Sequence, residues 1–216
     1  MIIVLFGPPG AGKGTQANYI ADEFNLFKIS TGDLLRKEIE KKSSLGIKIK
    51  TIIDKGLFVS DDIIDNLVER VISNKAYENR VIFDGYPRNI NQAKYLDSII
   101  NRHHQKISSV LNLKVDFDII VKRILGRQIC SKCTLIFNEF FYPATSNNHK
   151  CDSSFLQKRS DDNINTIKNR LKTYSNETIP ILNYYKNQKL LTNINGMNTI
   201  DEIYKEIRPI IHSLKT

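Results

Sequence analysis

The chain has 216 residues, 41% of them hydrophobic and 25% charged, which is enough for one sizeable core and typical of a soluble globular protein. No apolar run approaches the roughly 20 residues of a membrane span, and the N-terminus has no signal-peptide pattern, so we expect a cytoplasmic protein with no membrane partner. The net charge of +9 permits a nucleic-acid partner, but the lysines are scattered without interleaved aromatics, which favours phosphorylated small molecules and no nucleic acid.

The chain opens on a short apolar run, residues 2–6, which is typical of a strand buried in a parallel sheet. A glycine-rich turn over residues 7–15 follows and leads into a helix expected over 14–24. Its spacing fits G-x-x-x-x-G-K, a loop whose backbone N–H groups and lysine cradle phosphates. The strict motif continues with Ser or Thr, whose hydroxyl reaches Mg²⁺, whereas this chain has Gly14, with Thr15 one place late. The expected cradle is Gly10, Ala11, Gly12, Lys13, Gly14 and Thr15; the alternative is a tight turn without a ligand.

Further strands are expected at 27–30, 80–84, 108–113 and 189–194. Helices are expected at 34–41, 45–55, 63–74, 91–101, 116–126, 161 to about 176, 179–187 and 200–214. Strands that alternate with helices predict an α/β fold with a doubly wound parallel sheet. Ligands of such sheets bind beyond the carboxyl ends of the strands. The glycine-rich turn and the turn at Asp84-Gly85 are therefore expected at the same edge.

The pattern changes between Arg127 and about residue 163, where short strand and turn signals replace helix periodicity. We expect a β-rich flap inserted in the main domain. All three cysteines lie between 130 and 151, which argues against a disulfide framework and for a local metal site or reduced thiols. Cys130-Ser131-Lys132-Cys133 has the spacing of a knuckle suited to tetrahedral thiolate ligation.

Several short motifs follow one another along the chain in the order found in a known protein family. They are GPPGAGKGTQA at 7–17, Ile29–Arg36, Phe83-Asp84-Gly85-Tyr86-Pro87-Arg88, Gln92, Arg123–Arg127, Arg159–Asp162 and Arg170. With them the chain resembles the adenylate kinase family of nucleoside monophosphate kinases over essentially its whole length. Gly at 14 is the family's own form of the loop, whereas the family commonly has Phe at 86.

The resemblance implies Mg²⁺-dependent transfer of a phosphoryl group from ATP to AMP, giving two ADP, by a monomer. It also implies a P-loop core (1–30, 61–126 and 164–216), a helical AMP-binding insert (31–60) and a lid (127–163). Closure of both inserts would exclude water.

The resemblance also assigns site residues. The cations expected to converge on phosphate oxygens are Lys13, Arg88, Arg123, Arg159 and Arg170. Beyond the cradle, the expected ATP contacts are Arg123, which would stack on adenine, Arg127, Phe137 and Met197. The expected AMP contacts are Thr31, Arg36, Phe58, Val59, Gly85, Arg88, Gln92, Arg159 and Arg170. Gln92 would read the adenine edge, or alternatively be an exposed polar residue of a helix. Asp84 is expected to associate with Mg²⁺ through waters or, alternatively, to cap a helix or turn. Asp161 and Asp162 would orient the lid arginines or, alternatively, cap the helix that follows.

The flap departs from the family's zinc pattern, Cys-x₂-Cys followed by Cys-x₂-Cys or Asp. With Cys130, Cys133 and Cys151 in place, the family's fourth position falls on Ser154, a poor zinc ligand. Asp152 or His149 could replace it, but both lie so near Cys151 that a strained geometry is expected. The alternatives are therefore Zn²⁺ in the lid, or reduced cysteines in a lid held by packing of Phe137, Phe140, Phe141 and Tyr142.

Two rival functions stay open at this stage. The first is a kinase for UMP, CMP or another monophosphate, against which Thr31, Gln92 and the cysteine-bearing flap favour AMP. The second is a P-loop protein that binds nucleotides or nucleic acid without turnover.

Overall fold

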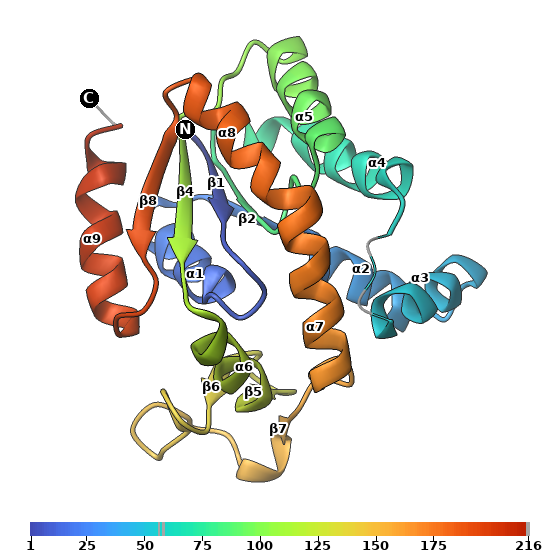
Figure 1. The fold of residues 1–216 in the computed structure, drawn as a ribbon, viewed down its shortest axis with the longest axis vertical. Helices are drawn as coiled ribbons and strands as arrows, with labels where there is room; N and C mark the ends of the chain where they lie inside the picture. The colour runs from blue at the N-terminus through green and yellow to red at the C-terminus, as the bar shows by residue number, and fades with distance from the viewer. Residues whose placement is uncertain (56, 58, 215–216) are drawn as a thin grey trace.

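The structure is a computed structural model that describes residues 1–55, 57 and 59–214 (Figure 1). Its centre is a five-stranded sheet in the order β2-β3-β1-β4-β8, and every neighbouring pair is parallel. The strands are β1 (Ile2–Phe6), β2 (Phe27–Ser30), β3 (Val81–Asp84), β4 (Ser109–Lys114) and β8 (Leu191–Asn195). The expectation of a parallel α/β sheet is thus confirmed.

Strand β1 shows why its apolar run forms a central strand. All five of its residues are buried, and successive side chains point to opposite faces of the sheet. Ile2, Val4 and Phe6 enter one core cluster, and Ile3 and Leu5 enter the other. Because both faces are covered by helices, no position of the strand needs a polar side chain.

The helices cover the sheet in two layers (Figure 1). Helices α1 (Lys13–Phe24) and α9 (Ile200–His212) pack with Ile3 and Leu5, and α4 (Asp61–Ile72), α5 (Ile90–Arg102) and α8 (Ile179–Asn187) pack on the opposite face. The remaining helices are α2 (Thr31–Glu40), α3 (Ser44–Asp54), α6 (Phe117–Leu125) and α7 (Ile164–Thr173), with short 3₁₀ turns η1 (Lys75–Tyr77) and η2 (Ser153–Phe155).

Two helix boundaries correct the sequence-based expectations. Helix α7 begins at Ile164, not at residue 161, because the Asn163 side chain caps it by accepting from the Thr166 N–H at 3.0 Å. Helices α7 and α8 are joined by a π-helical turn, η3 (Tyr174–Thr178), where a break was expected. Pro180 at the start of α8 has no N–H to donate to the preceding turn, so a regular α-helical ladder cannot run through this point.

The flap contains a small antiparallel sheet, as expected. Its strands are β5 (Arg127–Cys130), β6 (Ile136–Asn138) and β7 (Leu156–Gln157), in the order β6-β5-β7. It lies below the carboxyl ends of the main sheet in Figure 1. Phe137 is 2% exposed, with its ring stacked on Tyr142 and edge-on to His149.

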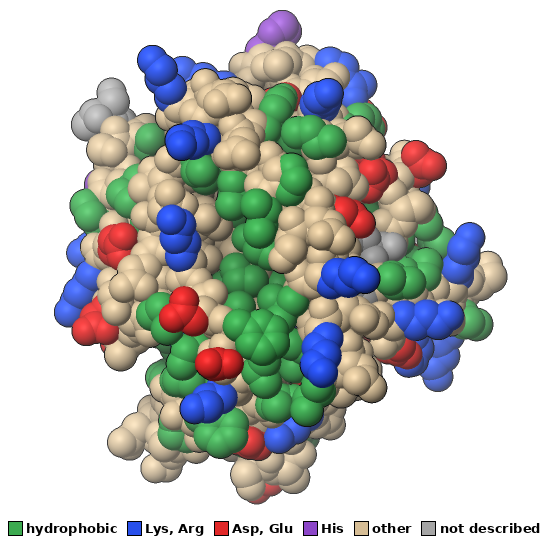
Figure 2. Space-filling model, in the orientation of Figure 1, with side chains coloured by type: hydrophobic (Ala, Val, Ile, Leu, Met, Phe, Trp, Pro, Cys, Tyr) green, Lys and Arg blue, Asp and Glu red, His purple; other side chains and the backbone are tan. Residues whose placement is uncertain are grey.

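The surface agrees with the scattered charge of the sequence. On the face in Figure 2, Lys and Arg side chains are scattered across the surface, and hydrophobic side chains gather along the middle. Within the described residues, no helix combines the length and the apolar character needed to cross a bilayer.

Candidate active site

A cleft of about 1140 Å³ lies at the carboxyl edge of the main sheet. Its walls come from the glycine-rich turn, the turn after β3, the start of α2, the flap and the turn after β8. The expectation that the two turns share one edge is confirmed, because β1 and β3 are parallel neighbours and both end there.

The glycine-rich turn has the backbone that a phosphate cradle needs. Gly10 and Gly12 have φ of +79° and +91°, in the left-handed region that side chains with a Cβ rarely adopt. A Cβ at Gly10 would also lie 2.7 Å from Ile124 of α6. Lys13 opens α1 and donates from Nζ to the carbonyls of Gly7 (2.7 Å) and Pro8 (3.0 Å). Its ammonium is thereby held over the turn, where a bound anion would lie.

Positive charge is concentrated around Lys13. Burial lowers the pKa of Lys13 to about 8; the charge of Asp84 opposes this, and those of Arg88, Arg127 and Arg170 add to it. Burial likewise lowers the pKa of Arg88 to about 10, with a further contribution from Arg170. These cations outnumber the nearby carboxylates, so the cleft is built to receive a polyanion.

We expect metal-free ATP to bind more weakly as the pH rises above about 8. The pKa of Lys13 is lowered to about 8, so above that pH the side chain loses the proton that phosphate binding needs. Binding should therefore take up a proton, and the Kd should rise by up to about tenfold per pH unit. Titration calorimetry in buffers of different ionisation enthalpy measures both effects. Lys13→Met should bind more weakly with a flat profile between pH 7.5 and 9.5; a flat profile in the unmodified protein would contradict the expectation.

Two aspartates hold two of the arginines. The Arg127 Nε donates to Asp162 Oδ2 at 2.8 Å in a two-pronged pair, and Arg170 pairs with Asp161. Both carboxylates are almost fully buried. They contact arginines and do not cap α7, so the alternative of a helix cap is wrong. Because a guanidinium is planar, a two-pronged pair fixes its direction as well as its charge.

Arg123 lies between the turn after β8 and the glycine-rich turn, where its Nη1 also reaches the Ala11 carbonyl at 3.5 Å. Its Nη1 donates to the Gly196 carbonyl at 2.8 Å, and its guanidinium lies 5.6 Å from the ring centre of Phe141. Met197 is adjacent and half-exposed. Arg127, from the start of the flap, contributes positive charge at Lys13. Phe137 lies in the flap core, and Phe141 contacts Arg123 from the flap.

Arg159 extends the positive group from the flap side. Burial lowers its pKa to about 10, and the charges of Arg127 and Arg36 lower it further. Arg36 is paired with Asp33 on α2. Since Arg159 belongs to the flap and Arg36 to α2, the two segments face each other across the cleft.

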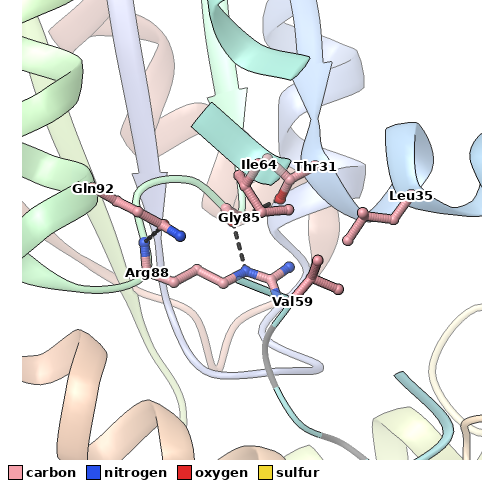
Figure 3. Close-up of a pocket in the computed structure, with 7 residues that line it drawn as sticks. All are labelled: Thr31, Leu35, Val59, Ile64, Gly85, Arg88 and Gln92. Carbon is pink, nitrogen blue, oxygen red and sulfur yellow. Dashed lines mark hydrogen bonds between the residues drawn. The ribbon is translucent and has the colours of Figure 1, made fainter. Parts of the chain in front are cut away.

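A small cavity of about 10 Å³ adjoins the cleft (Figure 3). Its lining residues are Thr31, Leu35, Val59, Ile64, Gly85, Arg88 and Gln92. Thr31 Oγ1 and Arg88 Nε both donate to the Gly85 carbonyl, at 2.9 and 2.7 Å. Gln92 is only 1% exposed, so the alternative of an exposed helical residue is wrong. Phe58, expected here as well, lies outside the described residues.

Asp84 fits a role beside a magnesium ion. Its Oδ2 lies 3.1 Å from the place that a Cβ at Gly14 would take, so the carboxylate occupies the space of the missing side chain. Its charge acts on both Lys13 and Arg88. Carboxylate oxygens are preferred Mg²⁺ ligands, usually with waters completing the shell.

The flap brings a set of metal-binding side chains together. Ligand atoms of Cys130, Cys133, His149 and Cys151 all lie within 4.8 Å of one another. Burial opposes ionisation of the Cys130 thiol, but hydrogen bonds from Cys133, His149 and the Lys132 backbone outweigh it and lower the pKa of the thiol to about 6. His149 is buried, and among the described residues its Nε2 has no hydrogen-bond partner. Three sulfurs and a ring nitrogen are a donor set that zinc accepts.

His149, expected only as an alternative to Ser154, is the residue that the structure places beside the three cysteines. The Ser154 N–H donates to Asp152 Oδ1 at 2.8 Å, and hydrogen bonding from Ser154 lowers the pKa of Asp152.

Comparison with known proteins gives one consistent family. The family model described as "Adenylate kinase" matches residues 5–190. A relative named "Adenylate kinase" from Pelagibacter ubique (strain HTCC1062) is 44% identical over 211 residues, covering 98% of this chain and 99% of its own. Relatives with the same name from Methanocella arvoryzae and Clostridium perfringens (strain SM101 / Type A) are 40% and 38% identical, and each alignment covers at least 99% of both chains.

Proposed function

This chain belongs to the adenylate kinase family, and we propose that it transfers the γ-phosphoryl group of ATP to AMP, giving two ADP, at the cluster around Lys13. The observation that carries the proposal is this cluster. Lys13, Arg88, Arg127 and Arg170 lie together between a phosphate cradle and a separate small pocket. A cleft with a donor side and an acceptor side suits two nucleotides that meet at their phosphates.

On the donor side, the backbone N–H groups of residues 10–15 and the Lys13 ammonium bind the ATP phosphates. Arg123, fixed by the Gly196 carbonyl, presents its flat guanidinium for stacking on adenine beside Met197. Arg127, oriented by Asp162, and Arg159 reach the phosphates from the lid. Phe137, in the core of the lid, supports the lid side of the ATP site.

On the acceptor side, Arg88 and Arg36 bind the AMP phosphate, and Arg170, oriented by Asp161, joins them. Thr31, Val59, Gly85 and Gln92 surround the nucleoside. The small cavity in the structure has room for about one water, so the insert that carries Val59 must move outward to admit a base.

The chemistry asks for alignment and charge compensation. The acceptor is a phosphate that is already ionised, so no general base is needed, and the arginines stabilise charge on the moving group. Mg²⁺, when bound, neutralises charge on the ATP phosphates, and Asp84 would hold it through waters.

The chain divides into three moving parts in this proposal: a P-loop core (1–30, 61–126 and 164–216), an AMP-binding insert (31–60) and a lid (127–163). Thr166 and Asn169 of α7 donate to the carbonyls of Asp54 and Lys55 in the insert, at 3.2 and 3.1 Å. These contacts support a boundary between the core and the insert at this point. Closure of insert and lid excludes water, the competing acceptor.

In the lid we propose a structural Zn²⁺ held by Cys130, Cys133, His149 and Cys151. Ser154, which stands at the family's fourth position, is not part of the proposed set because its hydroxyl is a poor zinc ligand and His149 supplies a fourth donor beside the three thiols. A closed four-ligand site would hold the two halves of the lid together around Phe137. The monomeric state, the cytoplasmic location and the lack of a nucleic-acid partner stay predictions.

Initial rates with ATP and each monophosphate test the choice of acceptor. We expect AMP to exceed UMP and GMP by at least about a hundredfold in kcat/KM, because Gln92 has a fixed amide for the adenine edge. A preference for UMP or CMP would overturn AMP as the substrate while leaving the kinase assignment in place.

A further inference from the structure

The side-chain amide of Gln92 is held in one orientation. Its Oε1 accepts from the Arg88 backbone N–H at 2.8 Å (Figure 3), and its Nε2 donates to Asp61 Oδ1 at 2.6 Å. Both bonds lie in a nearly dry place, since Gln92 is 1% exposed. The two contacts come from different elements, the turn after β3 and the first residue of α4.

Neither partner tolerates a flipped amide. A backbone N–H can only donate, and a carboxylate can only accept. A half-turn of the amide would set Nε2 against the Arg88 N–H and Oε1 against the Asp61 carboxylate. Burial leaves little water to repair either mismatch, so the observed orientation is strongly preferred.

Asp61 is itself fixed. The Asn89 Nδ2 donates to both of its carboxylate oxygens, at 2.9 and 3.0 Å. The Oδ1 of Asn89 accepts from the Gln92 N–H at 2.9 Å as the cap of α5, so Asn89 cannot flip either. One turn further along α4, Asp65 accepts from the Tyr86 hydroxyl at 2.7 Å and leaves Asp61 as the acceptor for Gln92.

We propose that Asp61 is a specificity-determining positioning residue that makes Gln92 select the hydrogen-bonding edge of the acceptor base. This rests on the proposed function, in which Gln92 faces that base. With its amide fixed, Gln92 offers the free lone pair of Oε1 and the second N–H of Nε2. Adenine can form both hydrogen bonds: its amino group donates to Oε1, and the unprotonated ring nitrogen beside it accepts from Nε2.

Bases whose edge has the reverse order of donor and acceptor would make two unfavourable contacts with Gln92. Hypoxanthine, guanine and uracil present a carbonyl beside a ring N–H. The carbonyl would face Oε1, and the N–H would face Nε2. The amide cannot rotate to relieve this without breaking its bonds to Arg88 and Asp61. Selection thus comes from the residue behind Gln92 as well as from Gln92.

The test compares AMP with inosine monophosphate, which has the same shape and the opposite edge. We expect the wild-type ratio of kcat/KM, AMP over inosine monophosphate, to be at least about a hundredfold. Asp61→Asn should lower that ratio at least about tenfold, mainly through KM, because an asparagine can donate or accept toward Gln92. The matched control is Asp62→Asn, which removes the same charge from the next, exposed residue and should change the ratio less than about twofold.

The possible outcomes distinguish failure of the proposed kinase activity from failure of the proposed role of Asp61. If the wild-type protein forms no ADP from ATP and AMP, the proposed function fails. If it uses AMP but Asp61→Asn and Asp62→Asn share the wild-type ratio, the role of Asp61 is overturned. Should Asp61→Asn not fold, the wild-type protein decides alone: equal kcat/KM for AMP and inosine monophosphate overturns the role, and a ratio above a hundredfold, with CMP also favoured over UMP, supports it.

Discussion

Replacing Arg88 by alanine is expected to lower kcat by about a thousandfold while the affinity for ATP changes only a few times. Arg88 follows the turn after β3 and lines both the large cleft and the small acceptor pocket. Its guanidinium is oriented by the Gly85 carbonyl. The charge of Arg170 lowers the pKa of Arg88, and the charge of Asp84 opposes this. A cation between the two nucleotide sites stabilises the group in transfer more than it stabilises bound ATP.

The alanine variant is a clean test because the backbone of Arg88 keeps its structural bonds. Its N–H still reaches Gln92, and its carbonyl still accepts from Thr178 at 2.7 Å. Arg88→Lys should recover little, because an ammonium cannot bind two oxygens with a planar fork. Arg80→Ala, which removes an exposed arginine that contacts Asn25, is the matched control and should keep wild-type kcat. A kcat within tenfold of wild type for Arg88→Ala would contradict the role.

The second large effect is expected in the lid. The purified protein should hold one Zn²⁺ per chain, and His149→Ala should lower the zinc affinity at least about a hundredfold. The reason is geometric: the His149 ring nitrogen lies with the three thiols within 4.8 Å. Elemental analysis and competition with a chromophoric chelator measure the stoichiometry and the affinity.

Ser154→Ala is the matched control, because Ser154 stands at the family's fourth position but donates to Asp152. It should keep one zinc per chain. Zinc lost from Ser154→Ala and retained by His149→Ala would restore the family's ligand pattern. No zinc in the unmodified protein, even after addition of the metal, would favour a lid held by packing alone.

Features that depend on neighbouring residues in the chain, such as the buried strand β1 and the glycine-rich turn, are predicted well from the sequence. The run over residues 2–6 is apolar at every position because β1 is covered on both faces, and the left-handed glycines at 10 and 12 are visible as a motif. The flap could be located because its composition differs from that of the helices around it.

The features that the sequence could not settle depend on how the chain folds in space. Asp61 and Gln92 are 31 positions apart, and only the packing of α4 against α5 makes them partners. Ser154, Asp152 and His149 were the candidates for a fourth metal ligand, and only the fold of the lid brings the His149 ring within 4.8 Å of the three sulfurs. Arg123 and Arg127 share one motif, but Arg123 lies in α6 and contacts the Gly196 carbonyl, whereas Arg127 opens β5 and pairs with Asp162, and only the path of the chain decides these partners.

The most direct test of the two-nucleotide cleft is the wild-type reaction itself, followed by phosphorus NMR. With Mg²⁺, ATP and AMP, the protein should form two ADP for each ATP consumed, with no inorganic phosphate, and ATP alone should stay intact. Release of inorganic phosphate as the main product, or ATP bound and not consumed in the presence of AMP, would contradict the account.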